Sequence, residues 1–134
     1  GDELIANVFS KDYYLEKFKE GAVVPLDNIL FKVGTSTILP ASYTSLDGLV
    51  MMMKLNPEMK IRILGHTDNS ASKGMSLKLS TKRAEAVKSY LLSQRVESKR
   101  VSVKGMGGDS PLVSNNSEEN KKKNRRVEFV VEKL

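Results

Sequence analysis

The hydrophobic pattern of the chain changes period along its length, and this change constrains the fold more than any other feature. Apolar and polar residues largely alternate over 59–64 and 126–133, which is typical of strands with one buried face. Between 76 and 94 apolar residues recur three or four positions apart, which indicates an amphipathic helix. A chain that combines both periods packs its helices against a sheet.

Turn and capping residues divide the rest of the chain into further elements. We predict the order strand, helix, strand, helix, strand, strand over residues 26–33, 42–55, 59–64, 76–94, 101–103 and 126–133. The mostly polar segment 110–124 is assigned no element. The predicted fold class is therefore α/β (α+β): a mixed β-sheet with a βαβαββ order and two main helices packed on it.

Size and composition fit one domain with a hydrophobic core. The chain has 134 residues, of which 40% are hydrophobic, and it contains no cysteine. The lack of cysteine excludes thiol catalysis, disulfide frameworks and zinc ribbons. No apolar run approaches the roughly 18 residues of a membrane-spanning helix. Because the chain opens on Gly1-Asp2-Glu3, we expect a piece of a longer parent protein, with 1–21 as a lead-in segment and 22–134 as the domain.

The net charge favours an anionic partner. The chain carries a formal charge of +6, and the run Lys121-Lys122-Lys123 is followed by Arg125 and Arg126. This 121–126 segment is either a solvated loop face or a patch for nucleic acid or another polyanion. Aromatic residues make up only 6% of the chain and no stacking platform is apparent, so we expect no nucleic-acid partner.

The single histidine does not indicate an enzyme. His66 lies close to Asp68, but the chain has no nucleophile elbow to complete a hydrolase triad. Asp and Glu residues are not spaced as a metal site. We therefore expect a histidine packed at a strand end, with no catalytic residues, no metal and no cofactor. The alternative, an α/β enzyme that uses His66 and Asp68, lacks any supporting set of residues.

Asp68 and Arg83 are the most informative polar residues. Asp68 follows the carboxyl end of a predicted strand, where open α/β sheets bind ligands, although an aspartate there can equally cap the turn. Arg83 flanks the apolar face of the predicted helix, where it could grip a carboxylate, pair internally with Asp68 or remain solvated. Side by side, the two could bind a zwitterion, with Asp68 on the ammonium and Arg83 on the carboxylate.

Four ordered motifs carry a resemblance to a known family. They are IRILGHTDN at 61–69, LSTKRAEAV at 79–87, RVSVKGMG at 100–107 and NRRVE at 124–128. Together they resemble the OmpA-like C-terminal domain, which is shared by outer-membrane proteins, peptidoglycan-associated lipoproteins and flagellar-motor stator proteins. The resemblance covers about residues 22–134, with a weaker match over 29–39.

The resemblance implies a binding module and not an enzyme. Domains of this kind bind peptidoglycan non-covalently through the diaminopimelate of its stem peptide, and so anchor an outer-membrane or periplasmic assembly to the cell wall. We accordingly expect a periplasmic domain that is attached to the outer membrane only through the rest of its parent protein. Other subunits of an envelope assembly are further expected partners.

The resemblance also assigns roles to individual residues. It places Asp68 on the ammonium and Arg83 on the carboxylate of diaminopimelate. The remaining residues of the implied ligand-binding set are Leu79, Thr67, Ser76, Lys32, Asn69 and Arg125. Leu79 lines the pocket, Thr67 and Asn69 shape its loop, and Arg125 belongs to the arginine pair with Arg126.

Four features of the sequence depart from the family pattern. Ala71 replaces a frequent glycine, Ser76 replaces an asparagine and is expected to cap the second helix, and Lys32 replaces an aspartate. The run 121–123 is also more basic than is usual. These departures predict a lower affinity or a preference for a variant stem peptide.

Overall fold

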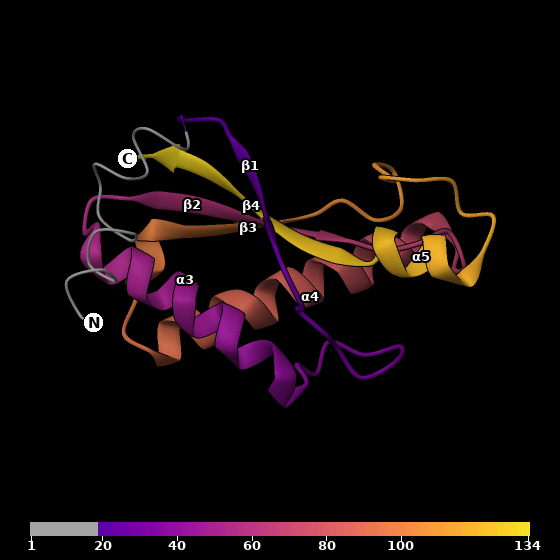
Figure 1. Cartoon of the computed structure of the whole chain (residues 1–134), viewed down its shortest axis with the longest axis horizontal. Helices are drawn as coiled ribbons and strands as arrows, with labels where there is room; N and C mark the ends of the chain where they lie inside the picture. Colours follow the sequence, from indigo (N-terminus) through magenta and orange to yellow (C-terminus); the bar gives the residue numbers. More distant parts are fainter. Residues whose placement is uncertain (1–18) are drawn as a thin grey trace.

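A four-stranded mixed sheet forms one layer of the molecule (Figure 1). The computed structural model describes residues 19–134, so most of the predicted lead-in segment lies outside the described residues. The strands are β1 (Val23–Leu26), β2 (Lys60–His66), β3 (Val101–Gly105) and β4 (Arg126–Lys133), in the spatial order β1-β4-β2-β3. β2 and β3 run parallel, whereas β4 pairs antiparallel with both β1 and β2. The predicted mixed sheet is confirmed.

Two long helices cover one face of this sheet. They are α3 (Tyr43–Leu55) and α4 (Lys73–Ser93), which Figure 1 shows together beneath the strands. Short 3-10 turns, Pro40–Ser42 and Ser98–Arg100, precede α3 and β3. A third helix, α5 (Glu118–Asn124), lies at the end of the sheet where β4 begins. Within residues 19–134, none of the helices combines the length and the hydropathy needed to span a membrane.

The core lies between the sheet and the two long helices. Ile61 and Ile63 of β2 alternate with exposed residues and are fully buried, as the strand period predicts. They pack with other buried apolar side chains from both layers, which include Leu46, Met53, Val87, Leu91, Phe129 and Val131.

The predicted first strand is wrong in position. The structure ends β1 at Leu26, and the predicted strand over 26–33 is mostly a loop with one isolated bridge between Phe31 and Ile38. The chain turns immediately after β1 because Asn28 adopts a positive φ of 60°, which asparagine tolerates well. Ser42 then holds the loop, since its Oγ accepts from the Leu30 N–H at 2.7 Å.

Capping residues explain two further differences between the predicted helices and those of the structure. The helix predicted over 76–94 begins at Lys73, because Ser72 is the N-cap and its hydroxyl accepts from the Met75 N–H. The expectation that Ser76 caps this helix is therefore wrong; Ser76 is buried within the first turns. The unpredicted α5 begins in the same way, after Ser117.

Two glycines bring α4 against the ends of the strands. A Cβ at Gly105 would lie 2.5 Å from the backbone nitrogen of Thr81, and one at Gly65 would collide with the Ser80 carbonyl. The absence of side chains at these positions lets the helix backbone approach the sheet directly. This contact places the first half of α4 beside the loop that follows β2.

Candidate binding groove

An open groove of about 940 Å³ lies beside the carboxyl end of β2. Three parts of the chain line it: the segment 25–34, the loop after β2 together with α4, and the segment 112–127. Its apolar lining includes Pro25, Leu26, Ile29, Leu30, Phe31, Val33, Leu79, Leu112 and Val113. Its charged lining includes Asp68, Arg83, Glu118, Lys122, Lys123, Arg125 and Arg126.

Asp68 both braces its own turn and lines the groove. Its side chain accepts a 2.8 Å hydrogen bond from the Ser70 N–H at one oxygen and a 2.6 Å bond from Arg125 at the other. Burial opposes ionisation, but these hydrogen bonds outweigh it and hold the pKa of Asp68 below its ordinary value. Asp68 is therefore a carboxylate at neutral pH, and the capping and ligand-binding interpretations are compatible.

Arg83 is held in place by the loop that follows β1. The residue is only 8% exposed, its Nε donates to the Thr35 carbonyl at 2.9 Å, and its guanidinium lies 4.8 Å from the centre of the Phe31 ring. Its two terminal amino groups make no hydrogen bond or ion pair with residues 19–134. A buried guanidinium with a fixed orientation and unused donors is suited to a carboxylate.

No ion pair joins Asp68 to Arg83 in the described part of the chain, because Asp68 pairs with Arg125 instead. The three charges nevertheless interact. Burial lowers the pKa of Arg83, the charge of Arg125 lowers it further, and the charge of Asp68 opposes both effects. The carboxylate of Asp68 thus interacts with two cations of the groove, Arg83 and Arg125.

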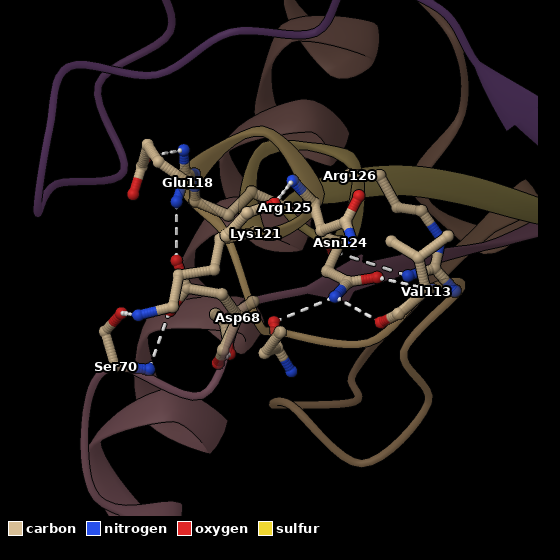
Figure 2. A network of polar contacts seen from close by, with 12 residues as sticks. Asp68, Ser70, Val113, Glu118, Lys121, Asn124, Arg125 and Arg126 are labelled. Carbon is tan, nitrogen blue, oxygen red and sulfur yellow. Dashed lines mark hydrogen bonds and ion pairs between the residues drawn. The ribbon is translucent and has the colours of Figure 1, made fainter.

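Arg125 connects the loop after β2 to α5, as Figure 2 shows. One amino group donates to Asp68 and the other donates to Glu118 at 2.7 Å. Burial disfavours the charge, yet the hydrogen bonds to Asp68 and Glu118 raise the pKa of Arg125. Lys121 adds a second tie, since its Nζ donates to Ser70 Oγ at 3.2 Å.

Asn124 fixes the polar segment before α5. Its fully buried side chain accepts from the backbone N–H groups of Leu112 and Val113, and donates to the Val113 carbonyl and to Asn115 Oδ1 (Figure 2). All hydrogen-bonding positions of this amide are used. Asn124 therefore sets the path of a segment that has no regular structure of its own.

Arg126 and His66 are packed polar residues in the groove lining. Arg126 Nε lies 3.3 Å from Glu128, and His66 Nε2 lies 2.5 Å from the other oxygen of that carboxylate. Burial, reinforced by the charge of Arg126, lowers the pKa of His66. This arrangement fits the packed-histidine interpretation. Across residues 19–134 we find no cluster of three or more His, Asp or Glu that could hold a metal ion.

The structure gathers most of the predicted site residues at one place. Six of them line the groove: Thr67, Asp68, Ser76, Leu79, Arg83 and Arg125. Lys32 and Asn69 are exposed and lie outside its lining. The sequence interpretation did not identify the apolar lining from 25–31 or the contribution of Leu112 and Val113. No long periodic pattern marks these residues, because the end of the short strand β1 and the loops bring them to the groove.

Comparison with known proteins gives consistent matches. Residues 30–125 match the model of the OmpA family. The probable lipoprotein YiaD of Escherichia coli is 33% identical over 108 residues, which cover 81% of this chain and 49% of that protein. The peptidoglycan-binding protein ArfA of Mycobacterium tuberculosis is 36% identical over 103 residues, which cover 77% of this chain and 32% of that protein. The chain thus spans about half or less of the length of these relatives.

A solved structure shares the fold. The peptidoglycan-associated lipoprotein of Burkholderia pseudomallei superposes with a TM-score of 0.72 at 25% identity. The superposition covers 81% of this chain and 88% of that one. The sheet and helices described above are therefore an arrangement already known from experiment.

Proposed function

Because the chain belongs to the OmpA family, as its motifs predicted, we propose that the groove binds peptidoglycan through the diaminopimelate of a stem peptide. Domains of this family are binding modules and not enzymes. Relatives whose names state peptidoglycan binding or association support the proposal that the ligand is peptidoglycan. The geometry of the groove supports the proposal that diaminopimelate is the group recognised.

The observation that carries this proposal is that the terminal amino groups of Arg83 have no partner among residues 19–134 and lie near the ionised Asp68. The end of a diaminopimelate side chain bears an ammonium and a carboxylate on one carbon. Arg83 can donate two parallel hydrogen bonds to the carboxylate. Asp68 can accept from the ammonium, because each of its oxygens has a second acceptor position beyond the bonds to Ser70 and Arg125.

We further propose that binding anchors a periplasmic assembly of the parent protein to the cell wall. The names of the relatives, a lipoprotein and a peptidoglycan-associated lipoprotein, support an envelope location. Attachment to the outer membrane would lie in the rest of the parent protein. One site of modest affinity suffices for anchoring, since many sites on one wall raise the avidity.

The alternative, a polyanion-binding patch at 121–126, is not favoured by the structure. Lys121 donates to Ser70, and Arg125 is paired with two carboxylates. Arg126 is largely buried beside Glu128. Most of the basic side chains of the segment are therefore used to build the groove, and only Lys122 and Lys123 remain exposed without a partner among residues 19–134.

Calorimetric titration with two matched stem peptides tests the proposal. One peptide carries diaminopimelate and the other carries L-lysine, which keeps the ammonium but lacks the side-chain carboxylate. We expect the parent domain to bind the diaminopimelate peptide about tenfold more tightly, because a charged hydrogen bond contributes about 1.5–3 kcal/mol. Arg83→Gln should remove this preference, whereas Asp68→Asn should lower the affinity for both peptides.

Lys82→Gln is the matched control, since Lys82 is an exposed neighbour of Arg83 on α4 outside the groove lining. Thermal unfolding verifies that each variant is folded. Equal binding of the two peptides by the parent domain would exclude the carboxylate contact of Arg83. Absence of saturable binding to either peptide would exclude the proposed function.

A further inference from the structure

Helix α5 contributes two lysines to the groove lining that have no partner in the described part of the chain. Lys122 and Lys123 are exposed, line the groove, and make no hydrogen bond or ion pair with any residue from 19 to 134. The neighbouring cations of the same segment do have partners: Lys121 donates to Ser70, and Arg125 pairs with two carboxylates. The two lysines are thus the charges that α5 leaves available.

The element that presents these lysines is firmly held. Ser117 caps the first turn by accepting from the Asn120 N–H, Asn124 makes four hydrogen bonds, and Arg125 ties the helix to the loop after β2. A ligand that meets α5 therefore has to order only two side chains and not a loop. This lowers the entropic cost of using them for binding.

The charges in the groove exceed what a single zwitterion can neutralise. Arg83 and Asp68 are sufficient for the ammonium and carboxylate of diaminopimelate, and Arg125 is satisfied by its own carboxylate partners. Lys122 and Lys123 come from a different element than Arg83, and their charge calls for a second anionic group on the same ligand.

We propose that Lys122 and Lys123 form a subsite for a second carboxylate of the stem peptide, so that the domain selects peptides whose carboxylates are free over amidated ones. This inference rests on the proposed function. A stem peptide offers two sources of such a group near diaminopimelate: the α-carboxylate of its D-glutamate and the terminal carboxylate of its D-alanine. Amidation of either one removes its charge and leaves the peptide otherwise unchanged.

Three tetrapeptides distinguish the two sources by calorimetry: one fully free, one amidated at D-glutamate and one amidated at the terminal D-alanine. We expect amidation at one of the two positions to weaken binding to the parent domain about threefold, the size expected of exposed ion pairs. The double variant Lys122→Gln/Lys123→Gln should bind all three peptides alike. The preference should also shrink as salt is raised, since exposed charges are screened.

The double variant Lys60→Gln/Lys133→Gln is the control for the loss of two charges. These exposed lysines face each other at the opposite end of β2 and lie outside the groove lining. This variant should retain the parent's preference. If the parent binds all three peptides equally, or if the Lys122/Lys123 variant keeps the preference, the subsite is excluded while the proposed function stands. If the parent binds none of them, the proposed function itself fails.

Discussion

Among single residues, Arg125 is the cation that pairs with Asp68, and it lowers the pKa of that carboxyl group both by its hydrogen bond and by its charge. We predict that Arg125→Gln raises the pKa of Asp68 toward the ordinary value of 3.8, since the hydrogen bond and the charge of Arg125 both lower it. A pH titration of the Asp68 side-chain carbon signal by NMR measures this change. The Ser70 N–H bond remains, so part of the depression should persist.

The same variant has a stability consequence with a defined sign. A carboxyl group with a depressed pKa in the folded state stabilises the protein above its unfolded pKa, and this contribution is lost as the pH falls through the folded pKa. Arg125→Gln should therefore lower the free energy of unfolding by about 1 kcal/mol at pH 7. The difference from the parent should close below pH 3.8. Glu118→Gln removes only the exposed ion pair with Arg125, so it should lower the free energy of unfolding by less. If the loss caused by Arg125→Gln did not depend on pH, it could not come from the ion pair with Asp68.

At the scale of elements, Arg100 joins the end of α3 to the start of β2. Its buried side chain donates to the carbonyls of Met53, Asn56 and Met59 at 2.7 to 3.0 Å. We predict that Arg100→Met, which nearly conserves volume, lowers the free energy of unfolding by about 3 kcal/mol, because the buried carbonyls lose hydrogen bonds from a charged donor. The Asn56 carbonyl still accepts from the Met59 N–H. Urea unfolding measures this loss. The adjacent exposed residue supplies the control, and Lys99→Met should change stability by less than about 0.5 kcal/mol.

The elements that the sequence predicted well are those whose burial follows a regular period. β4 and α4 each bury one face, and β2 does so over 60–63 before both of its faces become buried, so alternation or helical spacing marked them. α5 has no apolar face, and only the cap at Ser117 with acidic residues after it and lysines in its last turn could have indicated a helix. Arg100 could not be recognised as a buried donor, because its carbonyl partners lie more than forty residues away in sequence.

The sequence predicted site residues that lie on or next to regular elements, whereas contacts that depend on loops or on tertiary packing were not predicted. Asp68 and Arg83 were predicted from their positions at a strand end and on a helix flank, and the structure places both on the groove. The partner of Asp68 was not foreseen, since the choice of Arg125 over Arg83 depends on where α5 packs. Lys32 belongs to a turn whose path is set by Asn28 and Ser42, and a strand prediction could not place its side chain.

For the whole molecule, the groove exists only because three separate parts of the chain meet, so its affinity depends on the contact between α4 and the sheet. Gly105→Ala tests this dependence, because the new methyl group would lie 2.5 Å from the Thr81 backbone and force α4 outward. We predict a loss of about 2 kcal/mol in the free energy of unfolding, together with weaker binding of the diaminopimelate peptide. Gly48→Ala is the matched control in α3, since a methyl group there meets no atom within 4 Å.

The control should gain about 0.5–1 kcal/mol and leave affinity unchanged, because alanine restricts the unfolded chain and favours the helix. Comparison of Gly105→Ala with Arg83→Gln separates an effect on the position of α4 from the loss of a ligand contact. Arg83→Gln should weaken binding with little change in stability beyond its lost contacts with Thr35 and Phe31, whereas Gly105→Ala should lower both affinity and stability. If Gly105→Ala destabilised the domain yet retained full affinity, the position of α4 would not control the groove. Asp68 and Arg83 would then have to act independently of the sheet–helix contact.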